Sequence, residues 1–81
     1  MAPISIDDGV QTLRRRIGDT IRHLREEKSL SQEKFAELTG HHRTYIGFLE
    51  RGERTPNVAT LQRIAEALGI KLSELLNRAG L

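Results

Sequence analysis

The stretch QEKFAELTGHHRTYIGFLERG, residues 32–52, decides the fold of this chain. Counted from Gln32 as position one, a small residue stands fifth, a glycine ninth, and two apolar residues fifteenth and eighteenth: Ala36, Gly40, Ile46 and Leu49. A small residue lets a second helix cross closely over the first, and glycine takes the positive φ that a tight turn requires. The apolar residues then hold the second helix to the core. The stretch therefore predicts a helix-turn-helix.

The second helix of this pair, expected at about residues 42–51, has two different faces. Ile46 and Leu49 share one face, which suits a core. The opposite face carries Thr44, Gly47, Phe48 and Arg51. A face meant only for solvent does not usually carry Phe, and Gly within a helix costs roughly 1 kcal/mol relative to Ala. This face is therefore expected to meet a partner.

Helical spacing of apolar residues continues on both sides of this unit. A first helix is predicted from Val10 to about Lys28, after a loose tail at residues 1–8, and its stripe is Val10, Leu13, Ile17, Ile21 and Leu24. Asn57 is expected to cap a helix that ends at Gly69, with the buried stripe Val58, Leu61, Ile64, Ala65 and Leu68. A last short helix is predicted at about residues 72–78. The fold class is all-α, a compact five-helix domain at residues 9–81.

Composition excludes several classes of protein. The chain has 81 residues, no Cys and a net charge of +2, so we expect one domain without disulfides or thiolate metal sites. No apolar run approaches the roughly 20 residues of a membrane span, and the acidic N-terminus MAPISIDDG does not fit a signal peptide. There is no glycine-rich phosphate loop and no His/Glu pair at metal-ligand spacing. We expect a cytoplasmic protein that is not an enzyme and has no metal, membrane contact or small-molecule substrate.

Three segments resemble a known family: LSQEKFAELTG (30–40), RTYIGFLERGERTPN (43–57) and LQRIAEALGI (61–70). They are similar to the lambda-repressor-like DNA-binding domains of the Cro and XRE type. The middle segment most resembles the controller proteins of restriction–modification systems. The resemblance implies a transcriptional regulator that needs no cofactor. It implies sequence-specific binding of double-stranded DNA, as a homodimer on a palindromic operator, with the helix at about 42–51 in the major groove.

The resemblance also implies residue roles by matching position. Base-reading positions are occupied by His42, Arg43, Thr44, Gly47 and Phe48. Positions that touch the DNA backbone are occupied by Tyr45, Arg51 and Arg54. Gln32 is expected either to contact a phosphate or to brace the recognition helix, and Arg25 and Glu50 to form a buried ion pair. His42 stands where the family usually has a Ser, Thr or Asp cap, so the start of this helix is expected to be less firmly held.

Side-chain chemistry fits these roles. Arg43 can donate two hydrogen bonds to the O6 and N7 of guanine. Phe48 can pack on a thymine methyl, on a neighbouring loop or on a dimer partner. Gly47 either removes a side chain where the backbone is expected to approach bases or is merely tolerated in the helix. The arginines at 14–16 form a solvated face or flank the DNA. Gly18, inside the first helix, is expected to be a site of close packing.

The segment after Gly69 carries more apolar residues than a short helix can bury. We assign Ile70 and Leu75 to the core of the domain. The remaining residues, which we expect to form a dimer interface, are Leu72, Leu76 and Leu81.

Two alternatives stay open from the sequence. One is an antitoxin that represses its own operon and also binds a toxin. The other is a protein-interaction module that keeps the fold without affinity for DNA. Arg43 and the basic loop after Gly52 favour DNA, because phosphate contacts require basic residues.

Overall fold

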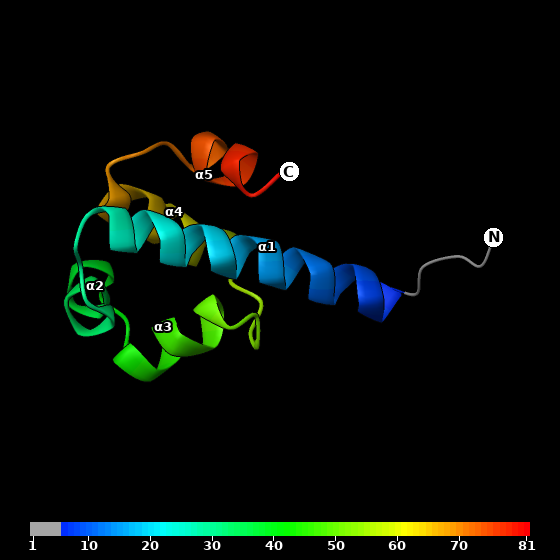
Figure 1. The fold of residues 1–81 in the computed structure, drawn as a ribbon, viewed down its shortest axis with the longest axis horizontal. Coiled ribbons are helices and arrows are strands. Elements are labelled where there is room, and N and C mark those ends of the chain that lie inside the picture. The colour runs from blue at the N-terminus through cyan, green and yellow to red at the C-terminus, as the bar shows by residue number, and fades with distance from the viewer. Residues whose placement is uncertain (1–5) are drawn as a thin grey trace.

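A computed structural model describes residues 6–81, with side chains from residue 9 onward. Its elements in chain order are α1 (Ile6–Glu27), α2 (Gln32–Thr39), α3 (Arg43–Glu50), α4 (Val58–Leu68) and α5 (Leu72–Arg78). Residues 6–81 contain no strand. Figure 1 shows α1 running along the molecule, with α5 on one side and α2 and α3 on the other. The predicted all-α, five-helix fold is confirmed.

The first helix is longer than its apolar stripe. α1 begins at Ile6 and not at Val10, so a loose tail is wrong for residues 6–8, while residues 1–5 lie outside the described part of the chain. Its first turns extend past the other helices (Figure 1), and Leu13 is exposed there. An apolar stripe indicates where a helix packs against neighbours and carries no information on turns that extend beyond them. The stripe therefore missed the true start.

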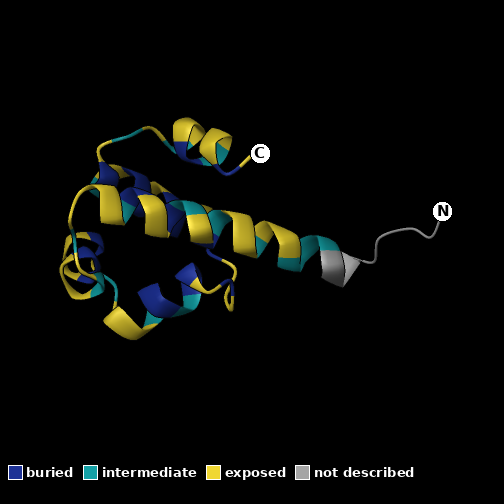
Figure 2. Cartoon of the chain, viewed as in Figure 1, coloured by how far each residue is buried: buried dark blue, intermediate teal, exposed yellow. Residues whose placement is uncertain are grey.

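The core lies where the five helices converge, and buried segments of these helices are dark in Figure 2. Its fully buried large side chains are Ile21, Phe35, Ile46, Leu49, Ile64, Leu68 and Leu75. Ile46 and Leu49 thus take the core positions predicted for them. Val58 does not, because it opens α4 beside an exposed loop, and it is 70% exposed. The rest of the predicted α4 stripe is buried.

The turn between α2 and α3 has the conformation that its glycine suggested. Ser31 caps α2 by accepting a hydrogen bond from the Lys34 amide, and Gly40 ends it with φ of 74°. The amide of the next residue, His41, returns to the Ala36 carbonyl at 3.0 Å. Such a left-handed residue after a helix is readily adopted by Gly and is strained for most other residues. The two helices are therefore joined within three residues.

Gly18 allows α1 to touch the end of α3. A Cβ atom at this position would overlap the carbonyl oxygen of Leu49 and lie 2.8 Å from that of Glu50. Both obstacles are backbone atoms, which cannot swing aside as a side chain can. The predicted role of Gly18 in close packing is confirmed.

Fewer apolar residues of the C-terminal segment remain outside the core than its composition suggested. Leu75 is buried, and Leu72 and Leu76 are half-buried because they pack against the core cluster, as does Ile70. The expectation that Leu72 and Leu76 stand free of the core is therefore wrong. Leu81 is 50% exposed.

Substitution of Gly18 by Ala is expected to lower the free energy of unfolding by about 1–3 kcal/mol, since the added methyl group must push two backbone carbonyls away. Gly9→Ala is the matched control, because Gly9 is in the same helix and a Cβ there meets nothing within 4 Å. The control should be neutral or stabilising by up to about 1 kcal/mol. Urea denaturation of the two variants measures both values. Equal stabilities would contradict the close-packing role.

Candidate nucleic-acid interface

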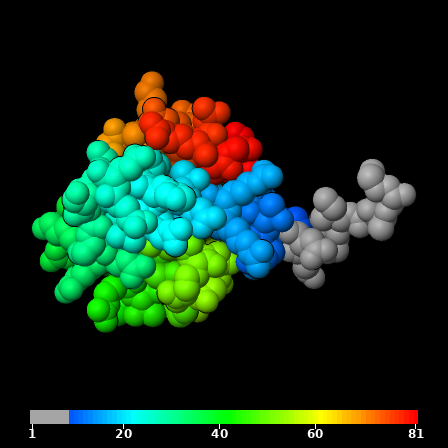
Figure 3. All heavy atoms as spheres, in the orientation of Figure 1, coloured from blue at the N-terminus to red at the C-terminus, as the bar shows by residue number. Residues whose placement is uncertain are grey.

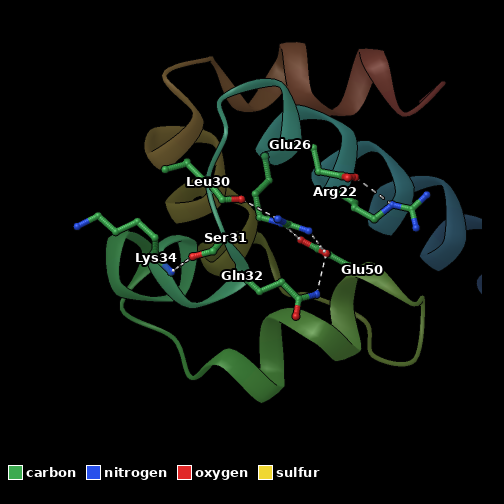
Figure 4. Close-up of polar contacts among 8 residues, drawn as sticks. Arg22, Glu26, Leu30, Ser31, Gln32, Lys34 and Glu50 are labelled. Atoms are coloured by element: carbon green, nitrogen blue, oxygen red, sulfur yellow. Dashed lines mark hydrogen bonds and ion pairs between the residues drawn. The ribbon is translucent and has the colours of Figure 1, made fainter.

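An ion-pair network holds the end of α3 against the rest of the domain (Figure 4). Arg25 of α1 donates from Nε and Nη2 to the two carboxylate oxygens of Glu50, at 2.6 and 2.9 Å. Gln32, the first residue of α2, donates from Nε2 to the same carboxylate at 3.0 Å. A third nitrogen of Arg25 donates to the carbonyl oxygen of Leu30 at 2.7 Å. One carboxylate thus joins three helices.

The network is largely out of solvent. The Glu50 side chain is 2% exposed and that of Arg25 11% exposed. The hydrogen bond to Glu50 raises the pKa of Arg25 above its ordinary value, and burial opposes this effect only in part. The guanidinium therefore stays charged, and its charge is matched by a two-point hydrogen bond. The predicted buried ion pair is confirmed, and Gln32 braces the recognition helix with its amide nitrogen.

His42 caps the start of α3, contrary to the expectation of a loosely held end. Its Nδ1 accepts a hydrogen bond from the Thr44 amide at 3.0 Å. An imidazole nitrogen can replace the oxygen of Ser or Asp as the acceptor, which residue frequencies at caps do not indicate. Next to it, the rings of His41 and Tyr45 are 5.1 Å apart. The first turn of α3 is therefore anchored on both sides of its cap.

The exposed side of this turn carries the predicted base-reading residues. His42, Arg43 and Thr44 are exposed, while Tyr45 is half-buried and packs against the core cluster. Ile46 and Leu49 hold the other side of the helix in the core. The structure thus fixes the backbone of the turn and leaves the side chains of Arg43 and Thr44 free to meet a ligand.

Phe48 lies under two guanidinium groups. The Cζ atom of Arg51 is 5.4 Å from the centroid of its ring, and that of Arg54 is 5.2 Å away. These distances are typical of cation–π contacts. The expectation that Phe48 packs on a neighbouring loop has support here, because Arg54 belongs to the loop after α3. The ring gathers two positive charges at one end of the recognition helix.

Gly47 makes room for an arginine. A Cβ atom on Gly47 would lie 3.0 Å from Nη1 of Arg51, so the guanidinium rests against the bare backbone. Arg51 itself follows α3 as its C-cap, and the next residue, Gly52, has a positive φ of 72°. In this structure, therefore, the space at Gly47 is taken by a side chain of the same molecule.

The loop after α3 is tied to α1, and Figure 3 shows it against the N-terminal half of that helix. Gln11 donates from Nε2 to the Gly52 carbonyl oxygen at 3.1 Å. Arg14 donates from Nε to the hydroxyl oxygen of Thr55. Backbone atoms of Arg15 lie so close to Gly52 that a Cβ there would be 3.2 Å from the Arg15 nitrogen. Of the three arginines at 14–16, Arg14 therefore has a structural partner.

Among residues 9–81, whose side chains the structure describes, no group of three His, Asp or Glu residues is arranged to hold a metal ion. No helix among these residues is long and apolar enough to cross a membrane.

A family model described as helix-turn-helix, HTH_3, matches residues 21–75. The chain belongs to this helix-turn-helix family. Its members are of the Cro/XRE type and include restriction–modification control proteins and transcriptional regulators. The match runs from the second half of α1 into α5, so it includes Arg25, Glu50 and the whole of α3.

Individual helix-turn-helix proteins are similar over most of the chain. Control protein C.SmaI of Serratia marcescens is 45% identical over 65 residues, which are 80% of this chain and 77% of that protein. The crystal structure of the restriction–modification controller protein C.AhdI from Aeromonas hydrophila has a TM-score of 0.74 and 40% identity, covering 76% of this chain and 94% of that one. The clp gene regulator ClgR from Corynebacterium glutamicum has a TM-score of 0.81 at 28% identity, covering 84% and 72%.

Sequence reasoning missed several residues near the helix-turn-helix. Glu53 pairs with Arg51, and Gln11 and Arg14 hold the loop, yet none was singled out for these contacts. The signal for Glu53 was its place as an exposed acid in an otherwise basic loop. No local signal exists for Gln11 and Arg14, because their partners are 41 residues away in the chain.

Replacing Glu50 with Gln is expected to destabilise the fold by about 3–5 kcal/mol, since the buried charge of Arg25 loses its partner. Thermal melting measures the loss. Glu37→Gln serves as the control, because the Lys34–Glu37 pair is solvent-exposed at 3.6 Å and such pairs contribute about 0–1 kcal/mol. If both variants have the same melting temperature, the ion-pair network is not the main interaction that holds α3 in place.

Proposed function

We propose that this protein binds double-stranded DNA sequence-specifically and regulates transcription as a homodimer on a palindromic operator. The observation that carries the proposal is the contrast between the two sides of α3. Ile46 and Leu49 are buried on one side, while the capped first turn offers Arg43 and Thr44 to solvent on the other. A helix held in this way can enter the major groove without losing its contact with the core.

Base reading is assigned to the first turn of α3. Arg43 can donate two hydrogen bonds to guanine O6 and N7, and Thr44 can offer both a hydroxyl and a methyl group. His42 uses Nδ1 for the cap, which leaves the far side of its ring for DNA. Because the cap fixes the backbone, these side chains approach the bases from a fixed starting point, which favours specificity over adaptability.

Phosphate contacts are assigned to the end of α3 and the loop that follows. Arg51 and Arg54 are exposed and lie together over Phe48. Tyr45 and the N-terminus of α2, where amide groups are unpaired by the helix, belong to the same proposed surface. Gln32 contributes by bracing Glu50, since its amide nitrogen is already in use. Phosphate contacts fix the register of α3 in the groove but do not read sequence.

Dimerisation is assigned to the C-terminal segment. Leu81 supplies the exposed apolar surface there, and the half-buried Leu72 and Leu76 border it in sequence. One recognition helix reads only a few base pairs, so a two-fold pair with half-sites about one DNA turn apart would supply the missing specificity.

Arg43→Ala and Arg54→Ala are expected to weaken DNA binding in different ways. Arg43→Ala should cost about 1–3 kcal/mol on sites selected from a random duplex library and relax the preference at one position per half-site. Arg54→Ala should weaken selected and mixed-sequence DNA alike and reduce the salt slope by about one unit. Fluorescence anisotropy over a series of NaCl concentrations gives both quantities. Equal losses on both kinds of DNA for Arg43→Ala would count against base reading.

Leu81→Glu is expected to weaken the dimer, because it puts a charge into the proposed apolar contact. Leu38→Glu on α2 is the matched control, since Leu38 is 51% exposed and Leu81 50% exposed. Neither change should unfold the domain. Sedimentation at micromolar concentration should find only Leu81→Glu shifted toward monomer. A dimer that survives Leu81→Glu would move the interface to another surface.

A further inference from the structure

The side chain of Arg51 is held against α3 by three neighbours. Its guanidinium covers Gly47 and lies over the ring of Phe48. On its outer side, Nη2 is 3.1 Å from a carboxylate oxygen of Glu53, and Nε donates to the same oxygen at 3.2 Å. Both side chains are about half exposed. Arg51 is therefore held in place without being removed from solvent.

This ion pair differs from the other exposed pairs of the described residues. Arg22–Glu26, Lys34–Glu37 and Arg78–Glu74 each join residues of one helix, at 3.5, 3.6 and 3.9 Å. The Arg51–Glu53 pair is shorter and joins the end of the recognition helix to the loop that follows. Among residues 41–57 the only acids are Glu50 and Glu53, and Glu50 is buried with Arg25. Glu53 is thus the exposed negative charge of an otherwise basic surface.

A carboxylate at this place competes with DNA. A phosphate that approaches Arg51 has to displace the carboxylate or share the guanidinium with it, and it is also repelled by the charge of Glu53. An arginine that is already neutralised contributes less to counterion release, which dominates affinity for DNA of any sequence. Arg43, which is assigned to base reading, has no acid beside it within residues 41–57, because Glu50 and Glu53 lie at the other end of α3.

We infer that the Glu53 carboxylate competes with a DNA phosphate for Arg51 and so weakens binding to all DNA. Base contacts then supply a larger part of the total free energy of binding. The inference rests on the proposed DNA-binding function and adds to it a residue that lowers the affinity for DNA of any sequence. Phe48 is a positioning residue in this inference. Its ring holds the guanidinium groups of Arg51 and Arg54 at the surface after a phosphate has displaced Glu53.

The test is the affinity for a mixed-sequence duplex, measured by anisotropy across NaCl concentrations for the full chain. Glu53→Gln keeps the size of the side chain and removes its charge. It should bind about two- to fivefold more tightly at low salt, as expected for the loss of an exposed ion pair, with a salt slope steeper by up to about one unit. The ratio of affinities for selected and mixed DNA should not rise.

Glu74→Gln is the matched control. It removes one negative charge and one exposed Arg–Glu pair on α5, on the opposite side of the molecule from α3 (Figure 1). It should leave the salt slope unchanged. If Glu53→Gln and Glu74→Gln change affinity equally, only net charge matters and the inference is overturned.

Two further variants separate this inference from the proposed function. Arg51→Gln should weaken mixed-sequence binding and remove the effect of Glu53→Gln in the double variant. If the affinity of the wild type falls with salt but Glu53→Gln does not change the affinity, only the inference about Glu53 is overturned. A wild-type chain without salt-dependent binding would overturn the proposed function and the competitor with it.

The role of Phe48 is tested by a pair of substitutions. Phe48→Tyr keeps the aromatic ring and should weaken DNA binding less than Phe48→Leu does. Phe48→Leu should weaken selected and mixed DNA by the same factor, because it loosens two phosphate contacts. A loss confined to one base position would instead assign Phe48 to base reading and overturn its positioning role.

Discussion

A single buried carboxylate determines how the recognition helix is held. Glu50 accepts hydrogen bonds from Arg25 of α1 and Gln32 of α2, and Arg25 also holds the turn between them through Leu30. The charge of Glu50 is costly to bury, so it is stable only when all of these donors are in position. The angle of α3 relative to α1 and α2 is therefore specified by polar geometry as well as by the less directional packing of Ile46 and Leu49.

Much of the helix-turn-helix could be predicted from the sequence, because the residues that form its turn and hold its second helix are close together in the chain. The spacing of Ala36, Gly40, Ile46 and Leu49 predicts the helix-turn-helix, and the cap signals at Asn57 and Gly69 predict α4. Apolar periodicity was less informative at the edges of the fold. It placed Val58 in the core and shortened α1, since a repeat cannot indicate where the neighbouring helices stop.

The candidate site was predictable as a set of residues but not as a set of contacts. Position in the motif identifies Arg43, Phe48 and Arg51, whereas the cap formed by His42 depends on a ring orientation that no spacing encodes. Likewise, the match of Gly47 to the guanidinium of Arg51 appears only when the side chain is seen folded back. The same limit applies to the tethers from Gln11 and Arg14, which depend on tertiary proximity.

The position of α1 between α3 and α5 has a mechanical consequence. Through Gly18 its backbone meets that of α3 with no side chain between them, and α5 packs on its other side (Figure 1). The recognition helix and the C-terminal segment thus pack on the same helix, α1. A tilt of either one relative to α1 would break these contacts. Two such domains paired through that segment would present their recognition helices at a fixed separation. Any mismatch with the spacing of half-sites would fall on the DNA, whose bending energy depends on the bases between them.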